Sequence, residues 1–181
     1  MSVPSVGGKC GKIPTVVSAF ERSIAIMFRE LEIKGFRSLG ELRLSGLGRV
    51  NLLVGTNNSG KTSVLEAVEM LAGQGDLGSF TAGLRRRREQ VFELDAETRS
   101  RGVRSVTRRL FPGFIMVSGS TFSIRGRNGS AESILTVEVD QQEQLDLLGD
   151  DELQLFLKLA WKNGDESIVR ELRLRPDGTL S

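Results

Sequence analysis

The sequence of 181 residues contains no histidine and one cysteine, Cys10. The lack of histidine excludes imidazole bases, nucleophilic triads built on histidine and most zinc sites. A single cysteine excludes an intrachain disulfide and a cysteine metal cluster, and it favours a reducing, cytoplasmic location. Any catalysis by this chain must therefore depend on carboxylates, lysine, arginine or the electrostatic stabilisation of phosphates.

Long apolar runs are also missing. No stretch approaches the length needed to span a bilayer, and the first residues lack the apolar core of a secretory signal. The sequence therefore predicts neither a membrane partner nor export. With 39% apolar and 27% charged residues, the composition is typical of a soluble globular domain with one hydrophobic core.

Charge is divided unevenly along the chain. Residues 1–130 contain 20 basic and 11 acidic residues, whereas residues 131–181 contain 5 and 12. Nine arginines lie between positions 85 and 109, including the run Arg85 to Arg88. Such a segment could grip DNA phosphates with a strong salt dependence. A solvated, partly helical insertion is the favoured alternative, because few aromatic residues are interleaved to stack on bases.

One motif organises the chain. Residues 55–62 read Gly-Thr-Asn-Asn-Ser-Gly-Lys-Thr and fit G-x-x-x-x-G-K-[ST], the pattern of a phosphate-binding P-loop. The apolar run at 50–54 before the motif predicts a strand buried on both faces. The stripe of Val64, Leu65, Val68 and Leu71 after it predicts an amphipathic helix. A chance match in a glycine-rich surface turn is the alternative that these flanks disfavour.

The motif assigns a role to each of its residues. Gly55 and Gly60 let the backbone curl closely around a phosphate, because they accept positive φ and carry no Cβ. Lys61 would reach the β- and γ-phosphates and is the candidate catalytic residue, while the Thr62 hydroxyl would bind Mg²⁺. Amide groups at the helix start would face the anion. The predicted nucleotide-binding residues are Gly55, Thr56, Asn57, Asn58, Ser59, Gly60, Lys61, Thr62 and Ser63.

Strand patterns lie on both sides of the P-loop. Alternating residues at 31–36 and 41–44 predict a hairpin before it. After the arginine-rich segment, residues 114–117, 121–125, 134–139 and 153–161 read as strands punctuated by glycine. Asn163-Gly164 predicts a type I′ turn, with a return strand through Ile168 and Leu172. Trp161 is expected to be a core residue rather than a cofactor contact.

A family resemblance is carried by residues 27–72. Residues 33–38 read Ile-Lys-Gly-Phe-Arg-Ser, a second short strand follows, and the loop reads Gly-x-Asn-x-Ser-Gly-Lys-Thr. This succession resembles the N-terminus of ABC-type AAA ATPases of the RecF, structural-maintenance-of-chromosomes and OLD nuclease group. The resemblance implies ATP and Mg²⁺ as cofactors, a link to DNA metabolism or phage defence, DNA as a partner, and a second ATPase half or a homodimer partner.

The expected fold is α/β (α+β), the first lobe of a P-loop NTPase. A mixed sheet would surround the P-loop helix, with an antiparallel β subdomain as the resemblance implies, and the domain would be incomplete. Residues 1–26 are expected to be a disordered or extraneous extension, and residues 27–181 a partial ATPase domain. Within it, residues 27–80 form the P-loop core, 81–112 an arginine-rich insertion and 113–181 the β subdomain.

Two motifs of a complete ATPase of this kind are not found. The nearest match to a Walker B strand is residues 134–140, but it alternates polar with apolar residues and Asp140 is followed by Gln141. No Leu-Ser-Gly-Gly helix follows the P-loop. The sequence therefore predicts ATP binding more firmly than hydrolysis. Two alternatives stay open: a small-molecule kinase with Arg85 to Arg88 as a lid, and a non-catalytic interaction fragment with a vestigial P-loop.

Overall fold

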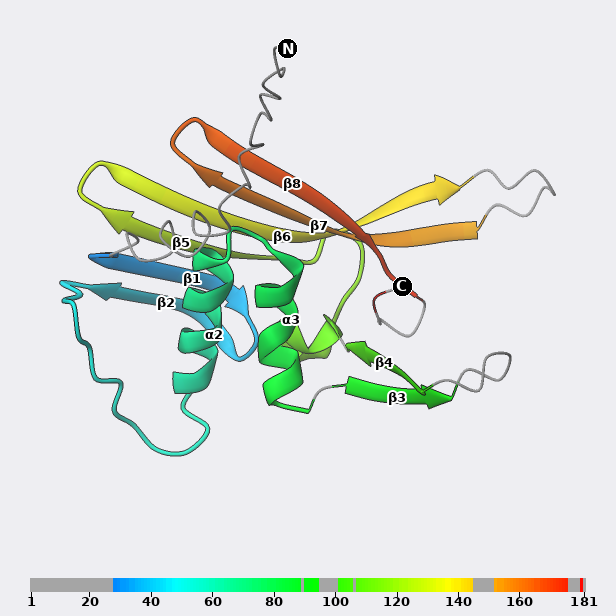
Figure 1. Cartoon of the computed structure of the whole chain (residues 1–181), viewed down its shortest axis with the longest axis horizontal. Helices are drawn as coiled ribbons and strands as arrows, with labels where there is room; N and C mark the ends of the chain where they lie inside the picture. The colour runs from blue at the N-terminus through cyan, green and yellow to red at the C-terminus, as the bar shows by residue number, and fades with distance from the viewer. Residues whose placement is uncertain are drawn as a thin grey trace, which may run out of the picture.

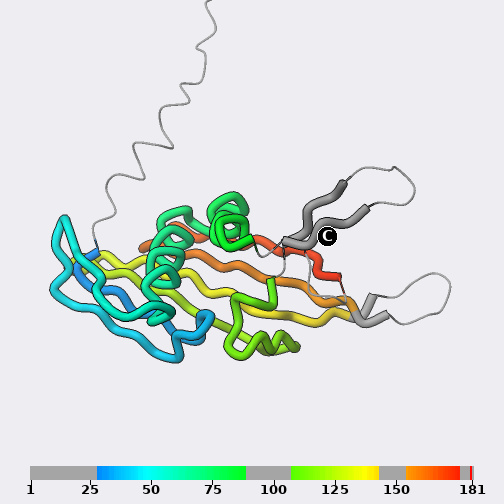
Figure 2. Tube along the Cα trace, turned by 90° about the horizontal axis from the view of Figure 1, so that it is seen from below, coloured from blue at the N-terminus to red at the C-terminus, as the bar shows by residue number. Residues whose placement is uncertain are grey.

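The computed structural model describes residues 28–88, 90–94, 101–105, 107–144, 152–175 and 180. Its main element is a six-stranded sheet in the order β2-β1-β5-β6-β7-β8, in which every neighbouring pair is antiparallel. Two helices, α2 (Lys61–Ala72) and α3 (Leu77–Arg86), cover one face of this sheet (Figures 1 and 2). The predicted α/β class is confirmed.

Hairpins build most of the sheet. The first predicted hairpin forms between β1 and β2, through a turn at Arg37 and Ser38. The later strands follow one another as a meander, so each pairs with its neighbour in sequence. The strands of the sheet are β1 (Glu30–Phe36), β2 (Leu39–Ser45), β5 (Thr121–Asn128), β6 (Ala131–Gln144), β7 (Glu152–Asn163) and β8 (Glu166–Arg173).

A separate two-stranded hairpin follows α3. It consists of β3 (Gln90–Leu94) and β4 (Arg101–Ser105), and it projects beyond the helices in Figure 1. Two short 3₁₀ turns, η1 (Thr107–Leu110) and η2 (Pro112–Phe114), return the chain to β5. The arginine-rich segment thus runs from the end of α3 through this hairpin to η1.

The hydrophobic core lies between the sheet and the two helices. Because side chains alternate along a strand, one face of β1, β5, β6 and β7 supplies apolar residues to it. Phe122 of β5 packs against the rings of Phe36 and Phe111, with centroids 5.0 and 5.4 Å apart. Trp161 is 2% exposed, as expected of a core residue. Other members are Leu31, Ile33, Ala67, Met70, Leu71, Phe80, Leu84, Ile124, Leu135, Val137, Val139, Leu157 and Leu159.

The strand predicted at residues 50–54 is not formed. These residues have no strand assignment, and Val50, Leu52 and Val54 are 91%, 86% and 82% exposed. A strand needs neighbours that pair with its backbone and cover its side chains, and no described strand lies beside this segment. Leu53, which packs against the core, is the contact that holds it.

Two smaller predictions also need correction. Residues 114–117 form no strand, because Pro112 begins a 3₁₀ turn and both Gly113 and Phe114 adopt left-handed backbone angles. The turn between β7 and β8 lies at Gly164 and Asp165, one residue later than predicted, since Asn163 pairs with Glu166. The extension predicted at 1–26, with Cys10, lies outside the described residues.

Candidate functional site

The P-loop motif leads directly into α2. The helix begins at Lys61, and its N-cap residue Gly60 has a left-handed backbone with φ of +86° and no side-chain capping bond. The first turn of α2 contains no acidic residue. The positive end of the helix dipole and its first amide groups are therefore available to an anion.

Two glycines keep the loop tight. A Cβ on Gly55 would lie 2.8 Å from the Ser59 hydroxyl oxygen, and one on Gly60 would lie 2.8 Å from Cδ2 of Leu39. The positive φ of Gly60 adds backbone strain for any other residue. Leu39 belongs to β2, so the hairpin before the loop fixes how closely the helix start approaches the sheet. Packing of the loop against Ser59 and Leu39 therefore favours glycine at both positions, as does the close approach of a phosphate that the motif predicts.

Lys61 folds back over the loop. Its ammonium group donates hydrogen bonds to the carbonyl oxygens of Gly55 (3.0 Å) and Thr56 (2.7 Å) and to the Ser59 hydroxyl (3.3 Å). Thr62, the residue after it, is exposed. The loop residues Thr56, Asn57, Asn58 and Ser59 are exposed as well. The lysine therefore closes the loop, while the threonine hydroxyl stays open to solvent.

A cavity of about 420 Å³ opens at the P-loop. Its volume lies within the range of sites for small molecules. Among the described residues that line it, four are cationic and none is a carboxylate, which gives this wall of the cavity a positive field. The structure thus brings part of the predicted site together with residues from three other segments. The lining residues are Arg37, Ser38, Asn57, Asn58, Ser59, Gly60, Lys61, Thr62, Ser63, Arg87, Arg109, Phe111, Gly113 and Phe114.

A buried carboxylate holds two of these arginines. Glu66, with a side chain 3% exposed, forms ion pairs with both arginines: its carboxylate oxygens lie 2.8 Å from Nε of Arg37 and 2.7 Å from Nε of Arg87. Arg87 also donates to the Ser63 hydroxyl at 3.2 Å. One carboxylate faces two guanidinium groups, so the cluster keeps an excess positive charge beside the cavity. Ser63 is buried beneath the loop by this contact rather than facing the cavity freely.

Sequence reasoning missed Glu66. The predicted apolar stripe includes Leu65, which is 62% exposed, whereas the buried face of α2 contains Ser63, Glu66 and Ala67. The other members of the predicted stripe, Val64, Val68 and Leu71, are buried or half-buried, so the apolar pattern located the inner face but not the carboxylate that shares it. Arg37 belongs to the Gly-Phe-Arg-Ser strand end, but its carboxylate partner lies 29 positions later and no local pattern connects the two.

The four consecutive arginines have different surroundings. Arg86 pairs with Glu69 on the exposed side of α2, and Arg87 reaches the buried Glu66. Arg85 and Arg88 are exposed and do not line the cavity. The two ion pairs fasten the end of α3 to the P-loop helix. Of the four arginines that a lid would use, Arg87 lines the cavity in this structure.

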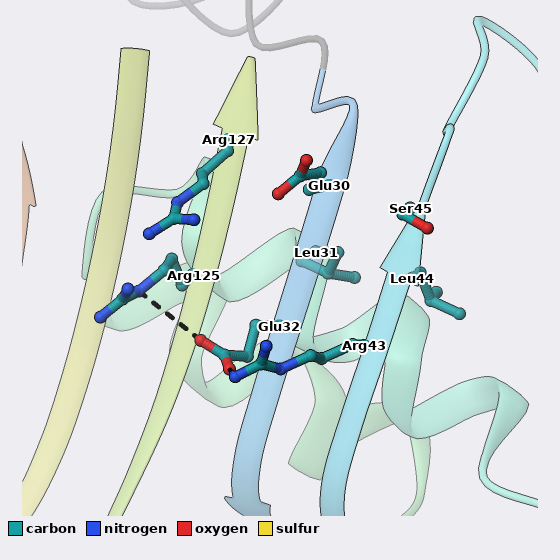
Figure 3. Close-up of a pocket in the computed structure, with 8 residues that line it drawn as sticks. All are labelled: Glu30, Leu31, Glu32, Arg43, Leu44, Ser45, Arg125 and Arg127. Atoms are coloured by element: carbon teal, nitrogen blue, oxygen red, sulfur yellow. Dashed lines mark ion pairs between the residues drawn. The ribbon is translucent and has the colours of Figure 1, made fainter. Parts of the chain in front are cut away.

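A second, shallow cavity lies on the opposite face of the sheet. Figure 3 shows Glu32 on β1 between Arg43 of β2 and Arg125 of β5, with Glu30 and Arg127 beyond. Glu32 pairs with Arg43 at 2.6 Å and with Arg125 at 3.7 Å, and Arg127 pairs with Glu132 at 2.6 Å. Burial acts to raise the pKa of Glu32, but the nearby Lys34, Arg43 and Arg125 together lower it. Two glutamates lie among the three arginines of this lining, whereas the described lining of the P-loop cavity has four cations and no carboxylate.

The Walker B candidate lies in the middle of the sheet. Residues 134–140 belong to β6, which pairs with β5 and β7, and Asp140 does not line the P-loop cavity. Among the described residues no cluster of three acidic or cysteine side chains could hold a metal ion. Among the described residues that line the cavity, no carboxylate lies beside Thr62, the magnesium ligand that the motif predicts.

Comparisons with known proteins agree with this site. The model of the AAA ATPase domain family matches residues 27–145. An uncharacterized protein of Methanocaldococcus jannaschii is 43% identical over 44 residues, and the DNA replication and repair protein RecF of Pseudomonas entomophila is 51% identical over 43 residues. Each match covers 24% of this chain, but 20% of the first relative and 12% of the second.

The family match, over residues 27–145, includes the P-loop motif at residues 55–62. None of the described helices is long and apolar enough to cross a membrane. Since the family model covers well over half of the sequence, the chain belongs to the AAA ATPase domain family and is an ATP-binding module of that family.

Proposed function

We propose that residues 55–63 bind the phosphates of ATP together with Mg²⁺. The observation that carries this proposal is the cavity at the start of α2, where Lys61, Arg37, Arg87 and Arg109 gather and no carboxylate is present among the lining residues. A triphosphate carries several negative charges, and a helix N-terminus flanked by cations suits such an anion. An added Cβ would meet Ser59 at Gly55 and Leu39 at Gly60, so the loop is packed tightly at the place where the phosphates would lie.

Each side chain has a distinct task in this proposal. Lys61 exchanges its loop carbonyl partners for the β- and γ-phosphate oxygens and balances their charge. Thr62 places its exposed hydroxyl as a ligand for Mg²⁺, which would neutralise charge on the phosphates. Glu66 keeps Arg37 and Arg87 at the wall of the cavity by pairing with both. These residues bind and orient the nucleotide.

Hydrolysis requires a group that this cavity does not contain. Among the described residues that line it, none is a carboxylate able to orient the attacking water. We propose that a second ATPase half or a homodimer partner supplies that group. The exposed Val50, Leu52 and Val54 support a partner with an apolar, strand-forming segment, because they stand unpaired directly before the P-loop.

A link to DNA metabolism is the broader proposal. It is supported by the likeness to RecF, a DNA replication and repair protein, over 43 residues. The nine arginines between residues 85 and 109 are compatible with a DNA partner. The resemblance to the OLD nuclease group makes phage defence a further possibility within the same proposal.

Equilibrium binding of Mg-ATP to the full chain tests the proposed site. We expect wild type to bind, Lys61→Ala to lose measurable binding, and Thr62→Ala to weaken binding only when Mg²⁺ is present. Lys34→Ala serves as the matched control, since Lys34 is a half-exposed lysine on β1 that pairs with Glu32 and Glu41. Equal affinity of wild type and Lys61→Ala would reject the assignment and favour a vestigial P-loop.

A further inference from the structure

An exposed phenylalanine lies on the wall of the P-loop cavity. Phe114 is 62% exposed, yet it lines the same cavity as Lys61 and Thr62. Phe111, the other aromatic residue of that wall, is 1% exposed and belongs to the core. Phe114 therefore presents the aromatic surface that a ligand in this cavity can reach.

The backbone holds this ring away from the core. Gly113 and Phe114 have φ of +62° and +60°, so two successive residues adopt the left-handed conformation. For a bulky residue such as phenylalanine that conformation is strained, at a level that structures retain where surrounding contacts impose it. The amide of Phe114 donates to the Phe111 carbonyl at 3.2 Å, and the Ile115 amide donates to Pro112 at 3.2 Å. These bonds hold the turn from which Phe114 reaches the cavity wall.

Neighbouring side chains connect this turn to the phosphate end of the cavity. The guanidinium of Arg109 lies 5.8 Å from the centroid of the Phe114 ring, and Arg109 also lines the cavity. Arg37, which Glu66 holds against the P-loop helix, donates from Nη1 to the Arg109 carbonyl at 3.4 Å. The turn with the aromatic ring is therefore tied to the P-loop helix through Arg37.

We propose that Phe114 stacks on the base of the bound nucleoside triphosphate, with Arg109 beside it. This inference rests on the proposed function, because it takes the phosphates to lie at residues 55–63. Bases stack on aromatic side chains through their π faces, and removal of one such ring weakens binding by about 5- to 150-fold. Stacking depends on a base, so the ring contributes to nucleotides and not to a free polyphosphate.

Binding of two ligands to the full chain separates these contributions. Mg-ATP and Mg-tripolyphosphate are titrated into wild type, Phe114→Ala, Phe114→Gly and Phe114→Trp. We expect Phe114→Ala and Phe114→Gly to weaken ATP binding by about 5-fold or more and to leave tripolyphosphate binding unchanged. Phe114→Trp, which keeps an aromatic ring, should retain the ATP affinity of wild type. Phe114→Gly relieves the strained φ, so a fold without loss of stability is expected for it. Ile115→Ala, at an equally exposed neighbouring position outside the cavity lining, is the control.

The outcomes distinguish this inference from the proposal beneath it. If wild type binds both ligands and neither truncation changes the ratio of their affinities, Phe114 does not contact the base and the inference is wrong. An equal loss of both ligands in the truncated variants would likewise overturn it, since that indicates a disturbed phosphate site. If wild type binds neither ligand, the proposed ATP site itself fails and the inference with it.

Discussion

The sheet and the P-loop segment of this chain differ sharply in how they use apolar residues. In β5, β6 and β7, alternate side chains such as Phe122, Val137 and Leu157 are at most 1% exposed, and both strand edges are paired. At residues 50–54, three apolar side chains are more than 80% exposed and no described strand pairs with the backbone. The same kind of sequence is therefore core in one region and surface in the other.

The difference shows which parts of the chain bury their apolar side chains within the described structure. The meander buries its apolar face against α2 and α3, so its contacts lie within the described chain. The segment before the P-loop has one core contact, Leu53, although the loop that follows is closed by Lys61 and by glycine packing. Contacts within the loop are enough to form the phosphate loop. Residues 50–54 before it form no strand, because no described strand pairs with their backbone.

The largest effect is expected in the sheet. Phe122→Ala removes a ring that contacts Phe36 and Phe111 and should lower the free energy of unfolding by about 3–5 kcal/mol. Chemical denaturation of the purified chain measures the change. A loss below about 1 kcal/mol would contradict the view that this region is the stable core.

Loss of the ion pairs made by α2 should have the next largest effect on the free energy of unfolding. Glu66→Gln leaves two guanidinium groups without their buried carboxylate and should destabilise the chain by about 3 kcal/mol. Glu69→Gln, which breaks the exposed pair with Arg86, should cost less than about 1 kcal/mol. Similar losses in both variants would mean that burial does not distinguish the two pairs.

A smaller effect should appear in acid. The pKa of Glu32 is lowered in the fold, so the folded state binds its proton less readily than the unfolded chain does. That stabilisation is present above the ordinary carboxyl pKa of 4.5 and is lost as pH falls below it. Melting temperatures of wild type and Glu32→Gln, measured across a pH series, should therefore converge on acidification, and a difference that stays constant down to low pH would contradict this assignment.

The smallest effect is expected before the P-loop. Leu52→Ser replaces a side chain that is 86% exposed, so the unfolding free energy should change by no more than about 0.5 kcal/mol. Leu157→Ser in β7 is the matched comparison, because the same chemical change there creates a buried, solvent-excluded hydroxyl. Equal destabilisation by the two substitutions would remove the contrast between the regions.

Local patterns predicted much of this architecture. Alternation located β1, β2, β5, β6 and β7, and the motif located the start of α2 at Lys61. The segment at 50–54 was misjudged because periodicity reports how apolar a strand is, not whether neighbours exist to cover it. The turn at Gly113 and Phe114 was read as strand because its apolar composition hides two left-handed residues.

The candidate site was predictable only in its contiguous part. Residues 55–63 follow from one motif, but Arg37, Arg87, Arg109 and Phe114 reach the cavity from separate segments. Their arrival depends on the hairpin β1-β2, which local alternation predicted, and on the buried Glu66 and the turn after η1, neither of which has a short-range signal. The DNA-related role and the partner remain predictions that rest on resemblance.

Amide hydrogen exchange of the full chain, with and without Mg-ATP, tests the account most directly. We expect rapid exchange at residues 52–54 and slow exchange at Phe122 and Val137 in the free chain, because only the sheet amides are paired. Mg-ATP should slow exchange at residues 57–63 in wild type and leave Lys61→Ala unchanged. Strong protection of residues 52–54 in the free chain, or an unchanged loop in saturating Mg-ATP, would contradict it.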